Sequence, residues 1–125
     1  MDTRDIARGY AGGRAALGVA LLVAPRVFGR VWLGRPGVGP VGSVTMRALG
    51  ARDLVMGAIA LHTLDHPEVG PRWHRTCAAV DAVDLVATAA ARRGLPRAGS
   101  ALVMALAGAG AATGAWLGAA LSPRA

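Results

Sequence analysis

The sequence predicts an all-α fold, an integral membrane bundle of four transmembrane helices in up-down-up-down order. The strongest observation is the stretch from Ser100 to Leu121, which carries no charge. A helix of that length rises roughly 33 Å, enough to cross a hydrocarbon core of about 30 Å. Charged residues make up only 17% of the chain, against about 25% in soluble domains. A third observation is that no sustained alternation of apolar and polar residues predicts a strand.

The helices are expected at about residues 10–33, 43–64, 73–93 and 100–121, in a single domain of residues 1–125. The first contains an apolar run from Ala15 to Ala24, and Pro25 is expected to kink or end it. A Gly/Pro-rich loop at 34–42 separates it from the second helix, for which Ser43 is the expected N-cap. Because all connections are short, neighbouring helices should run antiparallel.

The charge pattern favours a membrane partner. All 14 basic residues are arginine, which together with the excess of Ala and Gly is typical of a GC-rich bacterial genome. The arginines flank the apolar spans in short loops, as expected for contact with anionic lipid rather than nucleic acid. We therefore expect a multi-pass protein of the bacterial cell membrane that binds no nucleic acid. The arginines divide almost evenly between the two sides, so they favour neither orientation.

Residues that could hold a metal or form a disulfide are few. Cys77 is the only cysteine, so no disulfide can form within the chain. His62, His66 and His74 cluster around the second loop without a recognised ligand spacing. We expect neither a metal nor a cofactor.

Charged residues within the expected spans are the candidate functional residues. On the third helix, Cys77, Asp81, Asp84 and Thr88 follow steps of four, three and four, which place them on one face. A charge at bilayer depth costs at least about 2.5–3.5 kcal/mol, so this face should point into the bundle. Two carboxylates one turn apart in such a site should not both ionise easily, and one could act as a proton carrier or general acid.

Arginines on the first two helices match these acids in number. Arg14, Arg47 and Arg52 could neutralise Asp53, Asp81 and Asp84. One interpretation is a buried network that only specifies helix packing. The other is a site for a proton, a cation or a lipophilic or small polar ligand, formed by the same six residues with Cys77 and Thr88.

Two sets of glycines predict close helix contacts. Gly50 and Gly57 share a face of the second helix with Asp53, so a neighbouring helix could approach beside this carboxylate. On the fourth helix, small residues recur every four positions, a pattern that marks tight contact within or between chains. These residues are Gly110, Gly114 and Gly118. A homo-oligomer is the accompanying expectation.

The segment from Arg47 to Gly57, RALGARDLVMG, resembles a signature of small four-helix bacterial membrane proteins that are loosely DoxX-like. The segment from Arg14 to Gly18 and the Ala24–Pro25 pair fit the same pattern. The resemblance covers the first two helices in sequence and the last two only in architecture. It implies a membrane location and carries over Arg14, Arg47, Arg52 and Asp53 as site or packing residues. Some DoxX-like proteins are linked to quinone-associated redox complexes, but no cofactor ligands here support such a role.

Three classes of function remain open. The first is a transporter-like, proton-coupled or accessory binding protein of the membrane, built on the Arg/Asp network. The second is a membrane-embedded isomerase or cyclase of a lipophilic substrate with Asp81 or Asp84 as general acid. The third is a soluble or surface-bound helical protein. A closed apolar cavity would favour the enzyme, a polar path connected to water would favour transport, and no cavity would favour packing alone.

Overall fold

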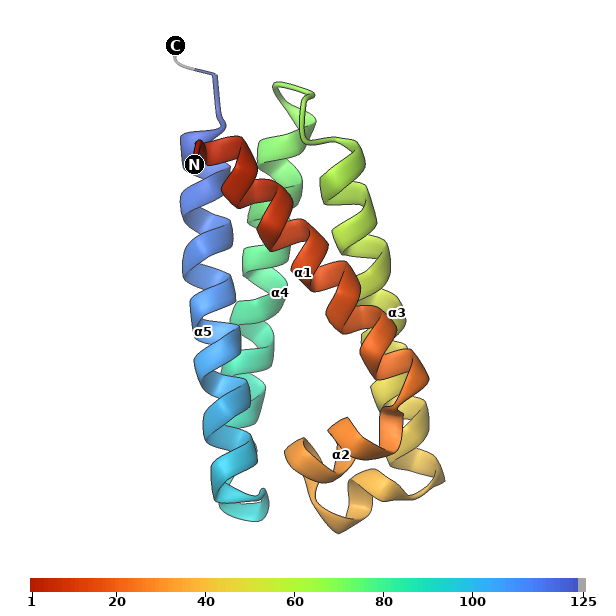
Figure 1. Ribbon diagram of the computed structural model, residues 1–125. Helices are drawn as coiled ribbons and strands as arrows, with labels where there is room; N and C mark the ends of the chain where they lie inside the picture. The colour runs from red at the N-terminus through yellow and green to blue at the C-terminus, as the bar shows by residue number, and fades with distance from the viewer. Residues whose placement is uncertain (124–125) are drawn as a thin grey trace.

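The computed structural model describes residues 1–123 as an all-helical chain with no strand in that range. Five α-helices and two short 3₁₀ helices follow one another, and Figure 1 shows that the four long helices alternate in direction. Their bounds are α1 Thr3–Val23, α2 Pro25–Leu33, η1 Arg35–Val38, α3 Pro40–His62, α4 Val69–Ala91, η2 Arg92–Gly94 and α5 Arg97–Ala120.

The first expected helix, residues 10–33, is wrong in both its start and its continuity. α1 begins at Thr3 because the carboxylate of Asp2 accepts hydrogen bonds from the backbone N–H groups of Arg4 and Asp5, at 2.6 and 3.0 Å. The side chain of Asp5 in turn accepts a hydrogen bond from the backbone N–H of Asp2, which completes a capping box. The backbone donors of Asp5 and Arg4 lower the pKa of the Asp2 carboxyl below its usual 3.8.

The same expected helix is broken at its middle. α1 ends at Val23, and α2 leaves it at an angle of 100°. Pro25 occupies the first position of α2, where its missing N–H costs no hydrogen bond and its fixed φ suits a new helix. The alternative that Pro25 ends the helix is therefore confirmed, and the residues after it form a separate short helix.

The other helices differ from expectation mainly at their starts. α3 begins at Pro40, so Ser43 lies inside the helix and is not its N-cap, a position that Gly39 occupies. α4 begins four residues before the expected Trp73, and α5 begins at Arg97.

The bundle consists of two tightly packed helix pairs. α1 crosses α3, and α4 lies along α5, while α2 fills the end between α1 and the start of α5 (Figure 1). A Cβ atom on Gly50 would lie 2.7 Å from the carbonyl oxygen of Gly18, and one on Gly57 would lie 2.6 Å from the backbone nitrogen of Ala15. Glycine is therefore required for the close contact of α1 with α3, as predicted for Gly50 and Gly57.

The glycine stripe of α5 is used within the chain. A Cβ atom on Gly114 would lie 2.7 Å from Oη of Tyr10 and 2.9 Å from the carbonyl oxygen of His74. Gly110 faces Asp81, and Gly118 faces Arg75 of α4. This stripe therefore lends no support to the expected homo-oligomer, which remains a prediction.

Much apolar surface is left uncovered. Large hydrophobic side chains are exposed on all five α-helices, among them Leu17, Val19, Val27, Val31, Val44, Val55, Val83, Val86, Leu102, Leu106 and Trp116. By length and hydropathy, α5 alone in the described chain could cross a membrane, with α1 and α2 as a second span if the bent pair counts as one. The described helices thus include one or two candidate spans, and the four-span membrane bundle stays a prediction.

Candidate functional site

Arg14 of α1 connects the two helix pairs. Its Nη1 donates a hydrogen bond of 3.0 Å to Oδ1 of Asp53 on α3, and its Nη2 donates to Oδ2 of Asp81 on α4. All three side chains are buried. A guanidinium carries five N–H donors in a planar fork, so one arginine can bind two carboxylates from different helices.

Arg52 of α3 forms the second half of the network. Its two Nη atoms donate to the two oxygens of Asp84 on α4, at 3.0 and 2.7 Å, in a bidentate pair. Its Nε also donates to Oδ1 of Asp53, at 3.2 Å. Asp53 therefore accepts hydrogen bonds from both arginines and joins the two halves of the network.

Tyr10 extends the network to α5. Its Oη lies 3.2 Å from Oδ2 of Asp81 and 3.1 Å from the carbonyl oxygen of Gly110, and it can donate to either. Nη2 of Arg14 lies 3.4 Å from the same Oη, and its guanidinium carbon lies 5.7 Å from the centre of the Tyr10 ring. Tyr10 was not among the site residues predicted from the sequence, although its position one turn before Arg14 on α1 was a usable signal.

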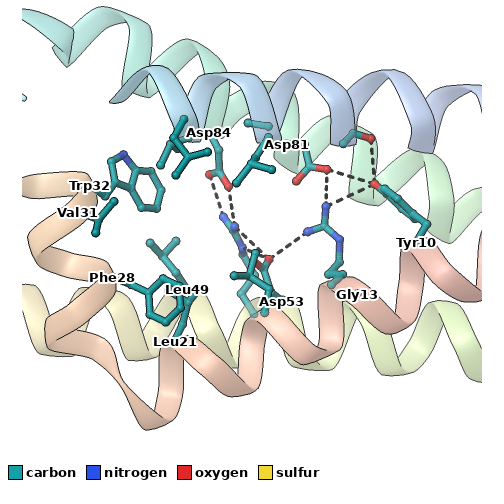
Figure 2. Close-up of a pocket in the computed structure, with 18 of the residues that line it drawn as sticks. Tyr10, Gly13, Leu21, Phe28, Val31, Trp32, Leu49, Asp53, Asp81 and Asp84 are labelled. Carbon is teal, nitrogen blue, oxygen red and sulfur yellow. Dashed lines mark hydrogen bonds and ion pairs between the residues drawn. The ribbon is translucent and has the colours of Figure 1, made fainter. Parts of the chain in front are cut away.

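A cavity of about 440 Å³ lies against this network. Figure 2 shows Phe28, Val31 and Trp32 from α2 on one side and the carboxylates of Asp81 and Asp84 on the other. The remaining lining is largely apolar and comes from α1, α3 and α5, with Leu17, Leu21, Leu49, Leu102, Val103, Leu106 and Ala107. The 100° bend after α1 brings the aromatic side chains of α2 over the cavity, so the break at Pro25 shapes the site.

The structure brings together five of the expected site residues and separates three others. Arg14, Arg52, Asp53, Asp81 and Asp84 all line the cavity. The inward orientation predicted for the polar face of α4 is confirmed, since Cys77, Asp81 and Thr88 are buried while Val83 and Val86 are exposed.

Arg47 is not part of the network. Its side chain is exposed, and its Nε donates a 3.4 Å hydrogen bond to the backbone carbonyl of Leu22. The expected match of three arginines with three aspartates is therefore wrong. Arg47 and Arg52 project about 140° apart around α3, so both cannot face α4.

Cys77 and Thr88 are buried but do not line the cavity. They lie about one helical turn to either side of the aspartates, and Oγ1 of Thr88 has no hydrogen-bond partner among the described residues. His74 is also buried, with Nδ1 2.9 Å from the carbonyl oxygen of Gly70. Within residues 1–123, no three His, Cys, Asp or Glu side chains are grouped to hold a metal ion.

These features define a helical protein in which a buried Arg/Asp network borders an apolar cavity. Comparison of the chain with protein-family models, curated proteins and solved structures gives no match. The DoxX-like resemblance therefore remains a prediction from the sequence.

Proposed function

We propose that this chain is a multi-pass bacterial membrane protein that binds a lipophilic molecule in the cavity beside the Arg/Asp network. The cavity itself carries the proposal. Its volume of about 440 Å³ falls within the roughly 300–1,000 Å³ of ligand sites, which are mostly apolar with a few placed polar groups. A transporter-like, proton-coupled or accessory role would each begin with this binding step.

The distribution of apolar and charged groups supports the membrane setting. Large apolar side chains that do not line the cavity are exposed on α1, α3, α4 and α5, whereas Arg14, Asp53 and Asp81 are buried and paired. In water, an exposed apolar surface on this scale is an aggregation hazard, but lipid would cover it. Ionisable groups in membrane proteins face the bundle interior and pair with one another, as these do.

The hydrogen bonds favour a binding role over acid catalysis. Both oxygens of Asp84 accept from Arg52, and Oδ2 of Asp81 accepts from Arg14. A general acid must present a carboxylic acid proton to its substrate, which pairing with an arginine opposes. The alternative of a membrane-embedded isomerase or cyclase rests on one observation, that Asp81 and Asp84 both line the cavity.

The test compares two glycines of α1 that face open space. Gly13 lines the cavity and Gly12 does not, and a Cβ atom at either position would meet no heavy atom within 4 Å. Gly13→Phe should obstruct the cavity, whereas Gly12→Phe adds the same side chain elsewhere on the helix. Each variant is purified in mild detergent, and the small molecules extracted from it are measured by mass spectrometry.

We expect a lipophilic molecule to accompany wild type and Gly12→Phe, and to be lost from Gly13→Phe. Equal retention by both variants would place binding outside this cavity. Extraction of the chain from membranes by carbonate without detergent would contradict the membrane setting.

A further inference from the structure

The network that borders the cavity has an unbalanced charge. It contains three carboxylates, Asp53, Asp81 and Asp84, and two guanidiniums, Arg14 and Arg52. A third guanidinium from Arg47 would have balanced the charge, but this side chain is exposed and lies outside the network. Within residues 1–123, Arg14 and Arg52 are the only arginines that line the cavity. With every group ionised, the network carries one excess negative charge.

Two carboxylate oxygens are left for a ligand. Oδ2 of Asp53 and Oδ1 of Asp81 accept no hydrogen bond from residues 1–123, although the two residues are only 6% and 8% exposed. Neither oxygen is fully enclosed by protein, in contrast to Nε of Arg14, which is sealed and cannot reach a ligand. A ligand head group in the cavity would therefore meet hydrogen-bond acceptors with excess negative charge.

Each carboxylate has an arginine partner, but three carboxylates share two guanidiniums, so one negative charge is left without compensation in a largely buried site. A cation supplied by the ligand would neutralise this excess charge. The ligand's apolar body would lie against the aliphatic and aromatic lining, with Trp32 and Phe28 of α2 across the cavity from the carboxylates. The site thus matches a molecule with one cationic, N–H-bearing end and one apolar end.

We propose that the cavity binds a lipophilic amine in its protonated, singly charged form, with the ammonium group at Asp53 and Asp81. This inference rests on the proposed function, because it names the class of ligand for the same cavity. It excludes fatty acids and other lipophilic anions as preferred ligands.

The experiment uses three probes of equal chain length, namely decylamine, decanol and decanoate, at pH 7. The protein is held in discs of phosphatidylcholine, whose head group has no N–H donor. Trp73→Phe and Trp116→Phe leave Trp32 as the only tryptophan, so its emission reports on the cavity wall. We expect saturable binding of decylamine that is at least about tenfold tighter than that of decanol, and no saturable binding of decanoate.

Three variants of the protein that keeps only Trp32 test whether the preference for decylamine over decanol depends on the network carboxylates. Asp81→Asn and Asp53→Asn each remove the excess charge and should reduce the preference for decylamine over decanol by about tenfold. Asp65→Asn is the matched control, since Asp65 is exposed, pairs with Arg4 and lies outside the cavity. If either network variant does not fold, the other still tests the preference.

A parallel set of discs contains phosphatidylethanolamine. Weaker decylamine binding there would identify a lipid ammonium as the occupant, and unchanged binding would identify a free amine; both support the inference. Equal affinity for decylamine and decanol would overturn the inference but leave the lipophilic cavity intact. Absence of saturable binding by all three probes, together with no co-purified molecule, would overturn both proposals.

Discussion

Tyr10 and Asp81 meet in the middle of the bundle, with Oη of Tyr10 3.2 Å from Oδ2 of Asp81. One residue belongs to α1 and the other to α4, so this contact joins the two helix pairs. The same Oη also contacts Gly110 of α5. A single phenol therefore connects three helices around the end of the cavity, and its removal is informative.

Tyr10→Phe should lower the free energy of unfolding by about 1 kcal/mol, because it removes a part-buried hydroxyl with a charged partner while keeping the ring. Thr45→Val is the matched control, since the Thr45 hydroxyl bonds only the exposed carbonyl of Val41 on its own helix. Denaturant unfolding in detergent measures both. An equal effect of the two substitutions would count against a tertiary role for the phenol.

Arg14→Gln and Arg47→Gln test which arginines belong to the network. Arg14→Gln removes the guanidinium shared by Asp53 and Asp81. Removing one partner of a buried ion pair lowers the free energy of unfolding by about 3–5 kcal/mol. Arg47→Gln alters an exposed side chain and should change stability by less than about 0.5 kcal/mol. Thermal unfolding of the two variants in the same detergent checks the difference. A larger loss for Arg47→Gln would contradict the assignment.

Gly114→Leu should separate α4 from α5. The added Cβ would lie 2.7 Å from Oη of Tyr10 and 2.9 Å from a backbone oxygen of α4, so the helices must move apart at a cost of about 1–3 kcal/mol or more. Gly108→Leu is the control on the same helix, where the nearest atom is 3.9 Å away, in Leu85. Thermal stability of Gly114→Leu equal to that of Gly108→Leu would show that the close contact is not needed.

We predict that Asp2, the N-cap of α1, makes a pH-dependent contribution to the stability of the folded chain. Its pKa in the folded chain lies below the usual 3.8, because backbone N–H groups bond the ionised carboxylate. The stabilisation by ionised Asp2 is therefore present above about pH 4 and is lost as pH falls through the lowered pKa. The difference in Tm between Asp2→Ala and wild type should shrink on acidification. A difference that is constant from pH 7 to pH 2 would show that the ionised cap does not contribute.

Part of this site was accessible from the sequence because it depends on helical spacing alone. Asp81, Thr88 and Cys77 share a face of α4 through steps of three and four residues, and that face is buried. Gly50, Gly57 and the α5 stripe were identified in the same way, and each lies at a close helix contact.

Which charged side chains pair with one another could not be predicted from the sequence. On α3, Arg47 and Arg52 were both expected in the network, yet only Arg52 reaches Asp84. Spacing gives the direction of each side chain around its own helix, but it does not say which neighbouring helix lies there. The roles of Tyr10 and of the α2 aromatic residues were missed for the same reason.

The sequence by itself determined that the chain is helical, that α5 is long and apolar enough to cross a membrane, and which residues share a helix face. These properties follow from local periodicity and composition, which need no knowledge of the partners. Only the tertiary structure decided which charges pair, that Arg47 is excluded and that a cavity forms beside the network. Those outcomes depend on the bend at Pro25 and on glycine-permitted contacts between distant helices, and no local pattern encodes where these bring side chains together.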